Sequence, residues 1–175
     1  QTAEDNHGLG LPIGMNETGF WGQADSTYRK QGWEFMLSGG ALYNNLDYSF
    51  STGFEDGTYP YWDKQPGGGS AQLRMQLGWM LSFLNEKPLT GMRPSRAHLL
   101  RLFANSPRIF MLGGDDSCCG YILSDSASSL ELDFAAGEYH VVSLDPVTGD
   151  RQETVTQSTK RGALSISLPR PTGDE

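Results

Sequence analysis

The chain has 175 residues, of which 37% are hydrophobic, and this is enough for a real core in one compact domain or in two small ones. The formal net charge of -8, with no run of Lys or Arg, argues against nucleic acid or an anionic membrane as the main partner and favours a neutral or cationic ligand. No apolar stretch approaches the roughly 20 residues that span a bilayer, and no signal-peptide pattern opens the chain.

The first predicted unit is a strand followed by a helix. Residues 11–15 are typical of a short buried strand. Asp25 or Ser26 can cap the following helix, and Gly39-Gly40 ends it.

The same order then repeats. A second strand over residues 41–47 is followed by a long aromatic loop, and Ser70 caps the next helix. The apolar residues of that helix recur with helical spacing: Leu73, Leu77, Met80, Leu81 and Leu84. Alternating strands and helices predict a parallel sheet with helical crossovers. A third helix is predicted after Pro94-Ser95, with Leu99, Leu102 and Phe103 on one side.

From about Pro107 the apolar period changes from helical to two, which is typical of strands. Apolar and polar residues alternate in three segments that are separated by turn-forming residues: 130–134, 139–143 and 164–168. We therefore expect an α/β domain over residues 1–106, followed by a small antiparallel β-sandwich over residues 107–175.

The cysteines Cys118 and Cys119 are neighbours in the chain. Disulfide geometry disfavours a bridge between adjacent residues, and no cluster of His or Cys accompanies them. Neither a vicinal bridge nor a metal site is the favoured interpretation, and the redox compartment stays open.

Carboxylates follow both predicted parallel strands, Glu17 after the first and Asp47 after the second. In parallel α/β architectures the reacting groups sit at the carboxyl ends of the strands, because the loops there converge over the sheet. The side chains of Glu17 and Asp47 are therefore expected to face the same opening at the carboxyl end of the sheet.

The loop over residues 48–63 is unusually aromatic for a connection. Exposed rings beside carboxylates suit sugars, whose C–H faces pack on aromatic faces while acids and amides bind the hydroxyls. The aromatic candidates for such a platform, some of which must pack in the core instead, are Trp21, Tyr43, Tyr48, Tyr59, Tyr61 and Trp62.

Several segments resemble a known family. IGMNETGF at residues 13–20, YRKQGWEFMLSGGA at 28–41 and LDYSF at 46–50 resemble strands 7 and 8 of bacterial (β/α)8-barrel glycosidases related to the cellulase and apiosidase-like groups. GEYHV at 137–141 and DPVTG at 145–149 are similar to the β-sandwich that follows those barrels, often labelled a collagen-binding domain. The resemblance covers nearly the whole chain, and NETGF and DPVTG are its most specific parts.

The resemblance implies a partial (β/α)8 barrel, made of strands 7 and 8 with their helices, in a glycoside hydrolase that needs no cofactor. The glutamate that ends strand 7 is the nucleophile of such retaining enzymes, and by position this is Glu17. The acid/base glutamate ends strand 4, which would precede this chain, so the chain alone is expected to be inactive. The chain opens at Gln1 without Met, which fits a processed protein or a piece of a longer one. A carbohydrate-degrading enzyme favours a secreted or periplasmic location.

Besides Glu17 as the catalytic residue, the predicted substrate-binding residues are Asn16, Trp21, Tyr43, Asp47, Tyr48, Glu55, Tyr61 and Trp62. Structural alternatives stand beside these roles. Glu17 could cap a turn or pair with Arg29, Asn16 could bond the local backbone, and Asp47 could hold the long loop by accepting N–H groups. Glu55 could tighten a turn or, with Asp56 and Asp63, bind a hard cation, although the spacing of a calcium loop is missing.

Other chemistries find less support. The histidines His7, His98 and His140 are scattered, which disfavours a triad or a histidine metal site. The run 67–69 before Ser70 could accept an anion, but it lacks the Lys of a nucleotide loop, and a flexible lead-in to the helix is favoured.

A second function class stays open, in which the β-sandwich is a non-catalytic module that binds glycan or protein, or braces the barrel. Two βα units also leave strand edges and helix faces uncovered. The chain is therefore expected either to self-associate or to form a reduced α/β layer.

Overall fold

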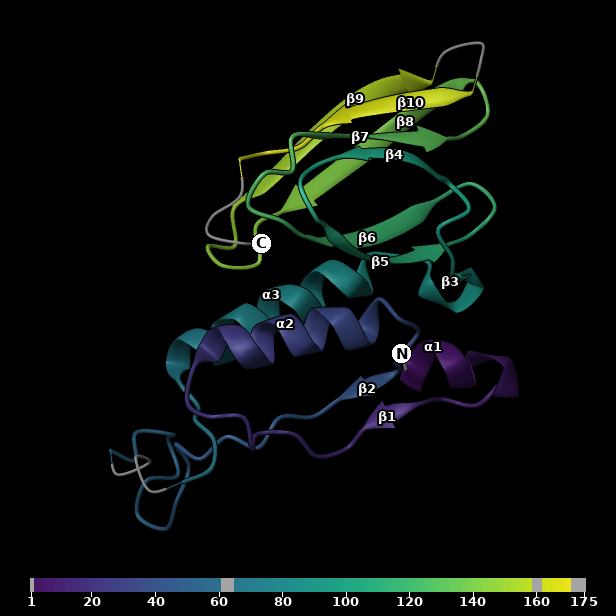
Figure 1. Cartoon of the computed structure of the whole chain (residues 1–175). Coiled ribbons are helices and arrows are strands. Elements are labelled where there is room, and N and C mark those ends of the chain that lie inside the picture. Colours follow the sequence, from purple (N-terminus) through teal and green to yellow (C-terminus); the bar gives the residue numbers. More distant parts are fainter. Residues whose placement is uncertain (1, 61–64, 159–161, 171–175) are drawn as a thin grey trace. The chain divides into compact units, whose positions relative to one another are not determined.

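The computed structural model describes residues 2–60, 65–158 and 162–170, and it divides the chain into two compact units, Gln1–Leu84 and Asn85–Glu175. Figure 1 shows the elements of both units. None of the described helices has the length and apolar character that a membrane crossing requires.

The first unit contains a parallel β-α-β arrangement. Its elements are α1 (Thr2–Asn6), η1 (His7–Leu9), β1 (Gly14–Met15), α2 (Asp25–Met36), β2 (Leu42–Tyr43) and α3 (Ala71–Asn85). β1 and β2 are parallel, with Gly14 opposite Leu42. The predicted parallel pair with a helical crossover is confirmed, but the regular strands are shorter than expected, and the sheet of the described residues does not close into a barrel.

Helices α2 and α3 lie side by side and cover one side of the β1–β2 pair (Figure 1). The Trp33 ring of α2 meets the Phe83 ring of α3 edge-on at 5.7 Å. Gly32 allows α2 to approach β2, because a Cβ there would lie 3.2 Å from Cε1 of Tyr43. Aromatic burial therefore holds the helix layer together and fixes it on the sheet.

The starts of the two long helices are linked by one hydroxyl group. Ser70 Oγ accepts the backbone N–H of Leu73 at 2.9 Å, so the predicted cap of α3 is confirmed. The same hydroxyl donates to Asp25 Oδ2 at 2.6 Å. The N-cap of α2 is Ala24, which makes no side-chain cap, and the predicted cap by Asp25 or Ser26 is wrong because Asp25 already lies inside the helix.

The second unit consists of short antiparallel sheets. Its elements are η3 (Leu89–Gly91), β3 (Arg93–Pro94), β4 (Leu99–Phe103), β5 (Arg108–Gly113), β6 (Cys118–Leu123), β7 (Ser129–Asp133), β8 (Gly137–Leu144), β9 (Arg151–Ser158) and β10 (Ala163–Ser167). The strand orders are β10-β7-β4, β3-β5-β6 and β8-β9.

The helix predicted after Pro94-Ser95 is wrong, because residues 99–103 form strand β4. Leu102 of β4 lies opposite Leu130 of β7, so cross-strand packing prevails over the helical spacing of these leucines. With this segment in the sheets, the compact units divide after Leu84, whereas the sequence placed the domain boundary at residue 107.

Residues of two different sheets share the core of the second unit. Ile109 and Met111 of β5 are buried in one cluster with Leu130 and Leu132 of β7 and Leu164 of β10. The period-two alternation predicted around Leu130 and Leu164 is therefore confirmed, since the apolar positions point inward.

The DPVTG segment forms the turn between β8 and β9. Asp145 Oδ1 accepts the backbone N–H groups of Val147 and Thr148, at 2.7 and 3.0 Å. Gly149 has φ of 80°, which favours glycine, and its N–H donates to the Asp145 carbonyl. The motif is explained by turn chemistry.

The adjacent cysteines lie in β6 as free thiols. Successive residues of a strand point to opposite faces, so this conformation does not bring their sulfur atoms together. Burial raises the pKa of Cys118 to about 11 and that of Cys119 to about 12.

Candidate functional site

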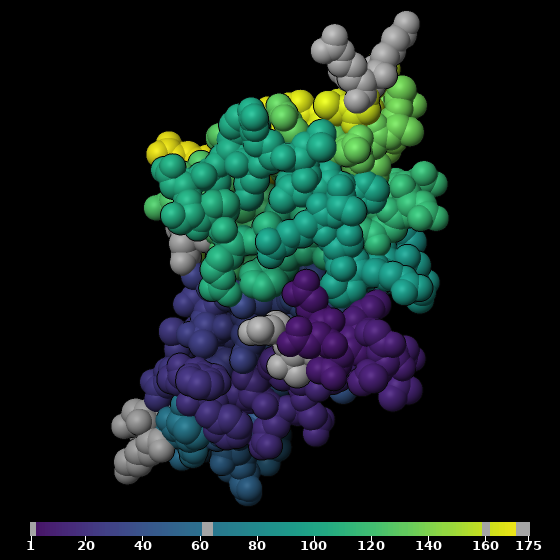
Figure 2. Space-filling view, turned by 45° about the vertical axis from the view of Figure 1, so that its right-hand side comes forward, coloured from purple at the N-terminus to yellow at the C-terminus, as the bar shows by residue number. Residues whose placement is uncertain are grey.

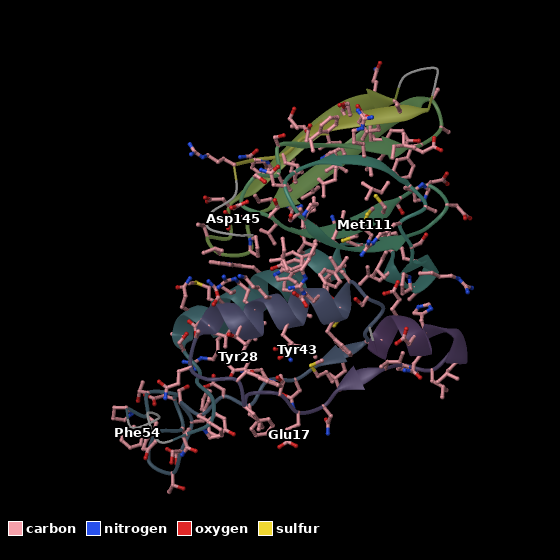
Figure 3. All side chains as sticks on the ribbon, in the orientation of Figure 1. Glu17, Tyr28, Tyr43, Phe54, Met111 and Asp145 are labelled. Atoms are coloured by element: carbon pink, nitrogen blue, oxygen red, sulfur yellow. The ribbon has the colours of Figure 1, made fainter. Side chains whose placement is uncertain are left out.

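The carboxyl ends of β1 and β2 form the candidate site. Hydrogen bonds continue the parallel pairing beyond the regular strands, since Leu46 N donates to the Thr18 carbonyl at 2.8 Å. Glu17 therefore lies within the paired region, and its side chain is exposed. Figure 3 shows Glu17 on the side of the sheet opposite to α2, whereas Tyr28 and Tyr43 lie between α2 and the sheet.

The Glu17 carboxylate makes no hydrogen bond or ion pair with the residues in the described ranges. The alternative pairing with Arg29 is not formed. Arg29 is buried and donates from Nη1 to Gln76 Oε1 at 3.0 Å, which links α2 to α3. Glu17 is thus a solvated carboxylate at a strand end.

Asn16 and Asn44 occupy neighbouring exposed positions on the two strands. Asn44 Nδ2 donates to the Asn16 backbone carbonyl at 2.8 Å. This bond fixes the backbone next to Glu17 and involves only the main chain of Asn16. The Asn16 side chain is exposed.

Asp47 does not share the environment of Glu17. Its Oδ2 accepts Arg74 Nη1 of α3 at 2.8 Å, and its Oδ1 accepts the backbone N–H of Ser49 at 3.0 Å. Of the two roles considered for Asp47, the structure shows the one that holds the long loop. Arg74 was not among the predicted residues, although an Arg in the first turn of the helix that follows a loop carboxylate indicates such a pair.

The loop of residues 47–59 packs on itself. The Phe54 and Tyr59 rings meet edge-on at 5.3 Å, and the Arg74 guanidinium lies 5.0 Å from the centre of the Phe50 ring. Glu55 Oε1 accepts the N–H of Gly53 at 2.9 Å, and this hydrogen bond lowers the pKa of Glu55. The turn-tightening role of Glu55 is therefore formed.

Of the other aromatic candidates in the long loop, the structure describes Tyr48. Tyr48 donates its backbone N–H to the Gly68 carbonyl at 3.2 Å, and its ring lies against Gly67. Tyr61, Trp62 and the acidic candidate Asp63 lie outside the described residues.

The glycine run 67–69 is a packed segment, and the favoured interpretation as a flexible lead-in is wrong. All three glycines are buried. A Cβ on Gly67 would lie 1.7 Å from the Gly19 carbonyl oxygen, and a Cβ on Gly69 would lie 1.7 Å from Asp47 Oδ1. Neighbouring chain segments approach so closely that side chains are excluded here.

Tyr43 faces the helix layer. Its hydroxyl donates to the Tyr28 carbonyl of α2 at 2.9 Å. Burial raises the pKa of Tyr43 well above its usual range. This ring belongs to the packing of α2 on β2.

Trp21 lies four residues beyond Glu17 and is 71% exposed. Its backbone is nevertheless fixed, because its N–H donates to the hydroxyl of the fully buried Tyr28 at 3.1 Å. The Tyr28 hydroxyl in turn donates to the Gly22 carbonyl. The indole is thus presented from a fixed backbone on the same strand-to-helix connection as Glu17.

The candidate site therefore consists of an exposed carboxylate, an exposed amide and an exposed indole on the segment at and after the carboxyl end of β1, from Glu17, Asn16 and Trp21. Asp47, Tyr43 and Glu55 are not available to a ligand in the same way, because their side chains are engaged in the contacts described above. Among the described residues, no group of His, Cys, Asp and Glu has an arrangement that could hold a metal ion. A scan against protein-family models and a search of curated proteins find no match to this chain.

Proposed function

We propose that this chain is the C-terminal part of a glycoside hydrolase that acts on a poly- or oligosaccharide, with Glu17 as the nucleophile. The observation that carries the proposal is the exposed carboxylate of Glu17 directly beyond the carboxyl end of a parallel strand. Enzymes with parallel β/α barrels hold their reacting groups at this position.

The open sheet supports a larger parent structure. Parallel sheets are normally covered on both faces, yet helices cover the β1–β2 pair on one side (Figure 1), and Leu42 is 54% exposed. We therefore assign β1 and β2 to strands 7 and 8 of a (β/α)8 barrel. The core shared by β5, β7 and β10 supports a β-sandwich in the second unit.

In a retaining glycosidase the nucleophile attacks the anomeric carbon, and a second carboxyl group about 5–5.5 Å away protonates the leaving oxygen and then deprotonates water. Glu17 supplies the first group. Asp47 is unsuited to be the second, because its oxygens are bound to Arg74 and Ser49. The acid/base must come from another part of the intact protein, and this chain alone is expected to be inactive.

The binding groups that we retain on described residues are Asn16 and Trp21, which are exposed and lie within four residues of Glu17 in the chain. The indole can stack on the C–H face of a sugar ring, and the amide can bond its hydroxyls. Tyr61 and Trp62 stay proposed as substrate-binding residues.

The test is glycosidase turnover of the intact protein with Glu17→Gln, which keeps the size of the side chain and removes the charge. We expect kcat to fall by more than about a thousandfold with unchanged thermal stability. Glu4→Gln is the matched control, since Glu4 is also an exposed glutamate of the first unit. Turnover of Glu17→Gln equal to that of the control would remove the assignment.

A second candidate is a non-catalytic glycan- or protein-binding module in the second unit. The observation that favours it is Val155 on β9, which is 62% exposed opposite His140 in the β8–β9 hairpin. A glycan array probed with the whole chain tests it. Binding through this face would survive Trp21→Ala and disappear in Val155→Asp, whereas loss in Trp21→Ala alone would contradict this candidate.

A further inference from the structure

The connection between β1 and α2 is held from several directions. Gly22 N donates to the Pro66 carbonyl at 3.0 Å, and Gly22 pairs with Gly67 in a parallel bridge. Gly19 has φ of 125°, and a Cβ there would lie 2.9 Å from the Leu46 backbone oxygen. A backbone with these restraints has few alternative conformations.

Tyr28 supplies the contact closest to Trp21. It is 0% exposed, and its hydroxyl accepts the Trp21 N–H and donates to the Gly22 carbonyl. One oxygen atom therefore bonds both sides of the Trp21–Gly22 dipeptide from within α2. A phenol hydroxyl can donate and accept at the same time, so one group satisfies a donor and an acceptor of this connection.

The contrast between backbone and side chain is the informative feature. Trp21 is 71% exposed, although burial of an indole ring would be favourable, while its backbone N–H is bonded to the buried Tyr28 hydroxyl. Tryptophan is enriched among the residues that contribute most of the binding energy at recognition sites. A fixed backbone limits the entropy that the ring would lose when a ligand stacks on it.

We propose that Tyr28 is a positioning residue of the binding site, which fixes the Trp21 backbone from which the exposed ring is presented to a sugar. This inference rests on the proposed function, because it takes the surface around Glu17 to be the sugar site. Tyr28 itself touches no ligand and acts through the Trp21 peptide.

The first experiment needs no ligand and measures amide hydrogen exchange of the whole chain at residue 21. Tyr28→Phe removes the hydroxyl and keeps the ring, and we expect exchange at the Trp21 amide to become at least about tenfold faster. Tyr43→Phe is the matched control, because it removes a phenol hydroxyl that bonds the Tyr28 carbonyl and leaves the Trp21 peptide intact. Equal exchange at residue 21 in both variants would overturn the proposal.

The second experiment measures binding at a temperature at which every variant is folded. The probes are hexamers of β-1,4-linked glucose, xylose and mannose, and Trp21 is observed by 19F NMR of 5-fluorotryptophan, with Trp21→Phe identifying its signal. We expect Tyr28→Phe to weaken the affinity about three- to tenfold, and Tyr43→Phe to leave it unchanged. A purely structural role of Tyr28 would lower the melting temperature of both variants without separating their affinities.

The outcomes distinguish the two proposals. In one outcome Trp21→Ala abolishes binding and Tyr28→Phe binds with the wild-type affinity. This result would overturn the positioning role of Tyr28 and would keep the proposed sugar site. Absence of binding of all three hexamers to the wild-type chain would overturn the positioning role on this chain, whereas the nucleophile is judged separately by turnover of Glu17→Gln.

Discussion

Arg74 Nη1 lies 2.8 Å from Asp47 Oδ2 and 2.8 Å from Ser49 Oγ, so the first turn of α3 holds the beginning of the long loop. Nη2 of the same guanidinium reaches the Gly57 carbonyl at 3.4 Å. One cation thus links both ends of the loop, and the Phe50 ring lies against it. At least one aromatic residue of the loop, Phe50, therefore packs against the Arg74 guanidinium.

Removal of this cation should loosen the loop. We expect Arg74→Met to lower the free energy of unfolding of the first unit by about 1–2 kcal/mol, with a discount for the partial exposure of the pair. Tryptophan fluorescence in urea measures this, since Trp21, Trp33, Trp62 and Trp79 all precede residue 85. Limited proteolysis should cut near residues 50–57 faster, and Arg101→Met in the second unit should change neither result.

Alanine should have opposite effects at two glycines of the first unit. Gly69→Ala should destabilise this unit by about 1–3 kcal/mol, because its Cβ would collide with the Asp47 carboxylate. Gly78→Ala should stabilise it by about 0.5–1 kcal/mol, because a Cβ at this helix position meets nothing within 4 Å. Urea titration checks both signs, and a neutral Gly69→Ala would show that the run 67–69 is not closely packed.

Stability should fall at alkaline pH through the buried thiols. Burial raises the thiol pKa from 9.0 to about 11 for Cys118 and about 12 for Cys119, so the folded state keeps protons that the unfolded chain releases. Their contribution is complete below about pH 9 and is lost between about pH 9 and 12.

The measurement compares unfolding of the wild type with that of Cys118→Ala/Cys119→Ala across this range by circular dichroism. We expect a smaller alkaline loss for the double variant. In the native protein at pH 8, iodoacetamide should label both thiols slowly, and rapid labelling of either would contradict this explanation.

We propose that the uncovered side of the β1–β2 pair leads to self-association of the isolated chain. The sheet has two strands in the described residues, and Leu42 is 54% exposed on it. The space-filling view shows the N-terminal segment with α1 and η1 at the surface of the first unit (Figure 2). Light scattering should give a mass that rises with concentration, and Leu42→Lys should reduce this rise.

Leu81→Lys is the control, at a position of α3 that is 60% exposed. Equal masses for both variants would contradict an association through the sheet.

The β-α-β unit was predictable because each part has a local signal. The strand before Glu17, the apolar spacing of α3 and the Ser70 cap are all contained in short segments. The structure confirms the cap and the helix, with Leu73, Met80 and Leu84 buried, but Leu81 is exposed. It has a strand only at Gly14–Met15, and the prediction that this strand is buried is wrong, because Gly14 and Leu11 are exposed. β4 was not predictable in this way, since its leucines fit a helix and only pairing with β7 makes them a strand. The β8–β9 turn was predictable from Asp145 and Gly149, whose chemistry is local.

The candidate site was predictable in its position and only partly in its members. The exposed strand-end carboxylate Glu17 has a sequence signal, because it follows an apolar run. The partners of Asp47 and Tyr43 come from helices that lie many residues away, so their engagement with Arg74 and Tyr28 depends on the packing. The same holds for the glycine run, whose close neighbours belong to two other segments, the β1–α2 connection and the start of the long loop.

The shared hydroxyl of Ser70 restricts which residues can occupy that position. It caps α3 as an acceptor and bonds Asp25 of α2 as a donor. Asp and Asn are good caps in isolation, but Asp would place a second anion beside Asp25, and the Asn oxygen that accepts the N–H cannot also donate. In a saturation library selected for folding, Ser and Thr should therefore be enriched at residue 70 over both Asx residues, whereas Asn, Asp and Ser are usually about equal as caps and Thr ranks below them.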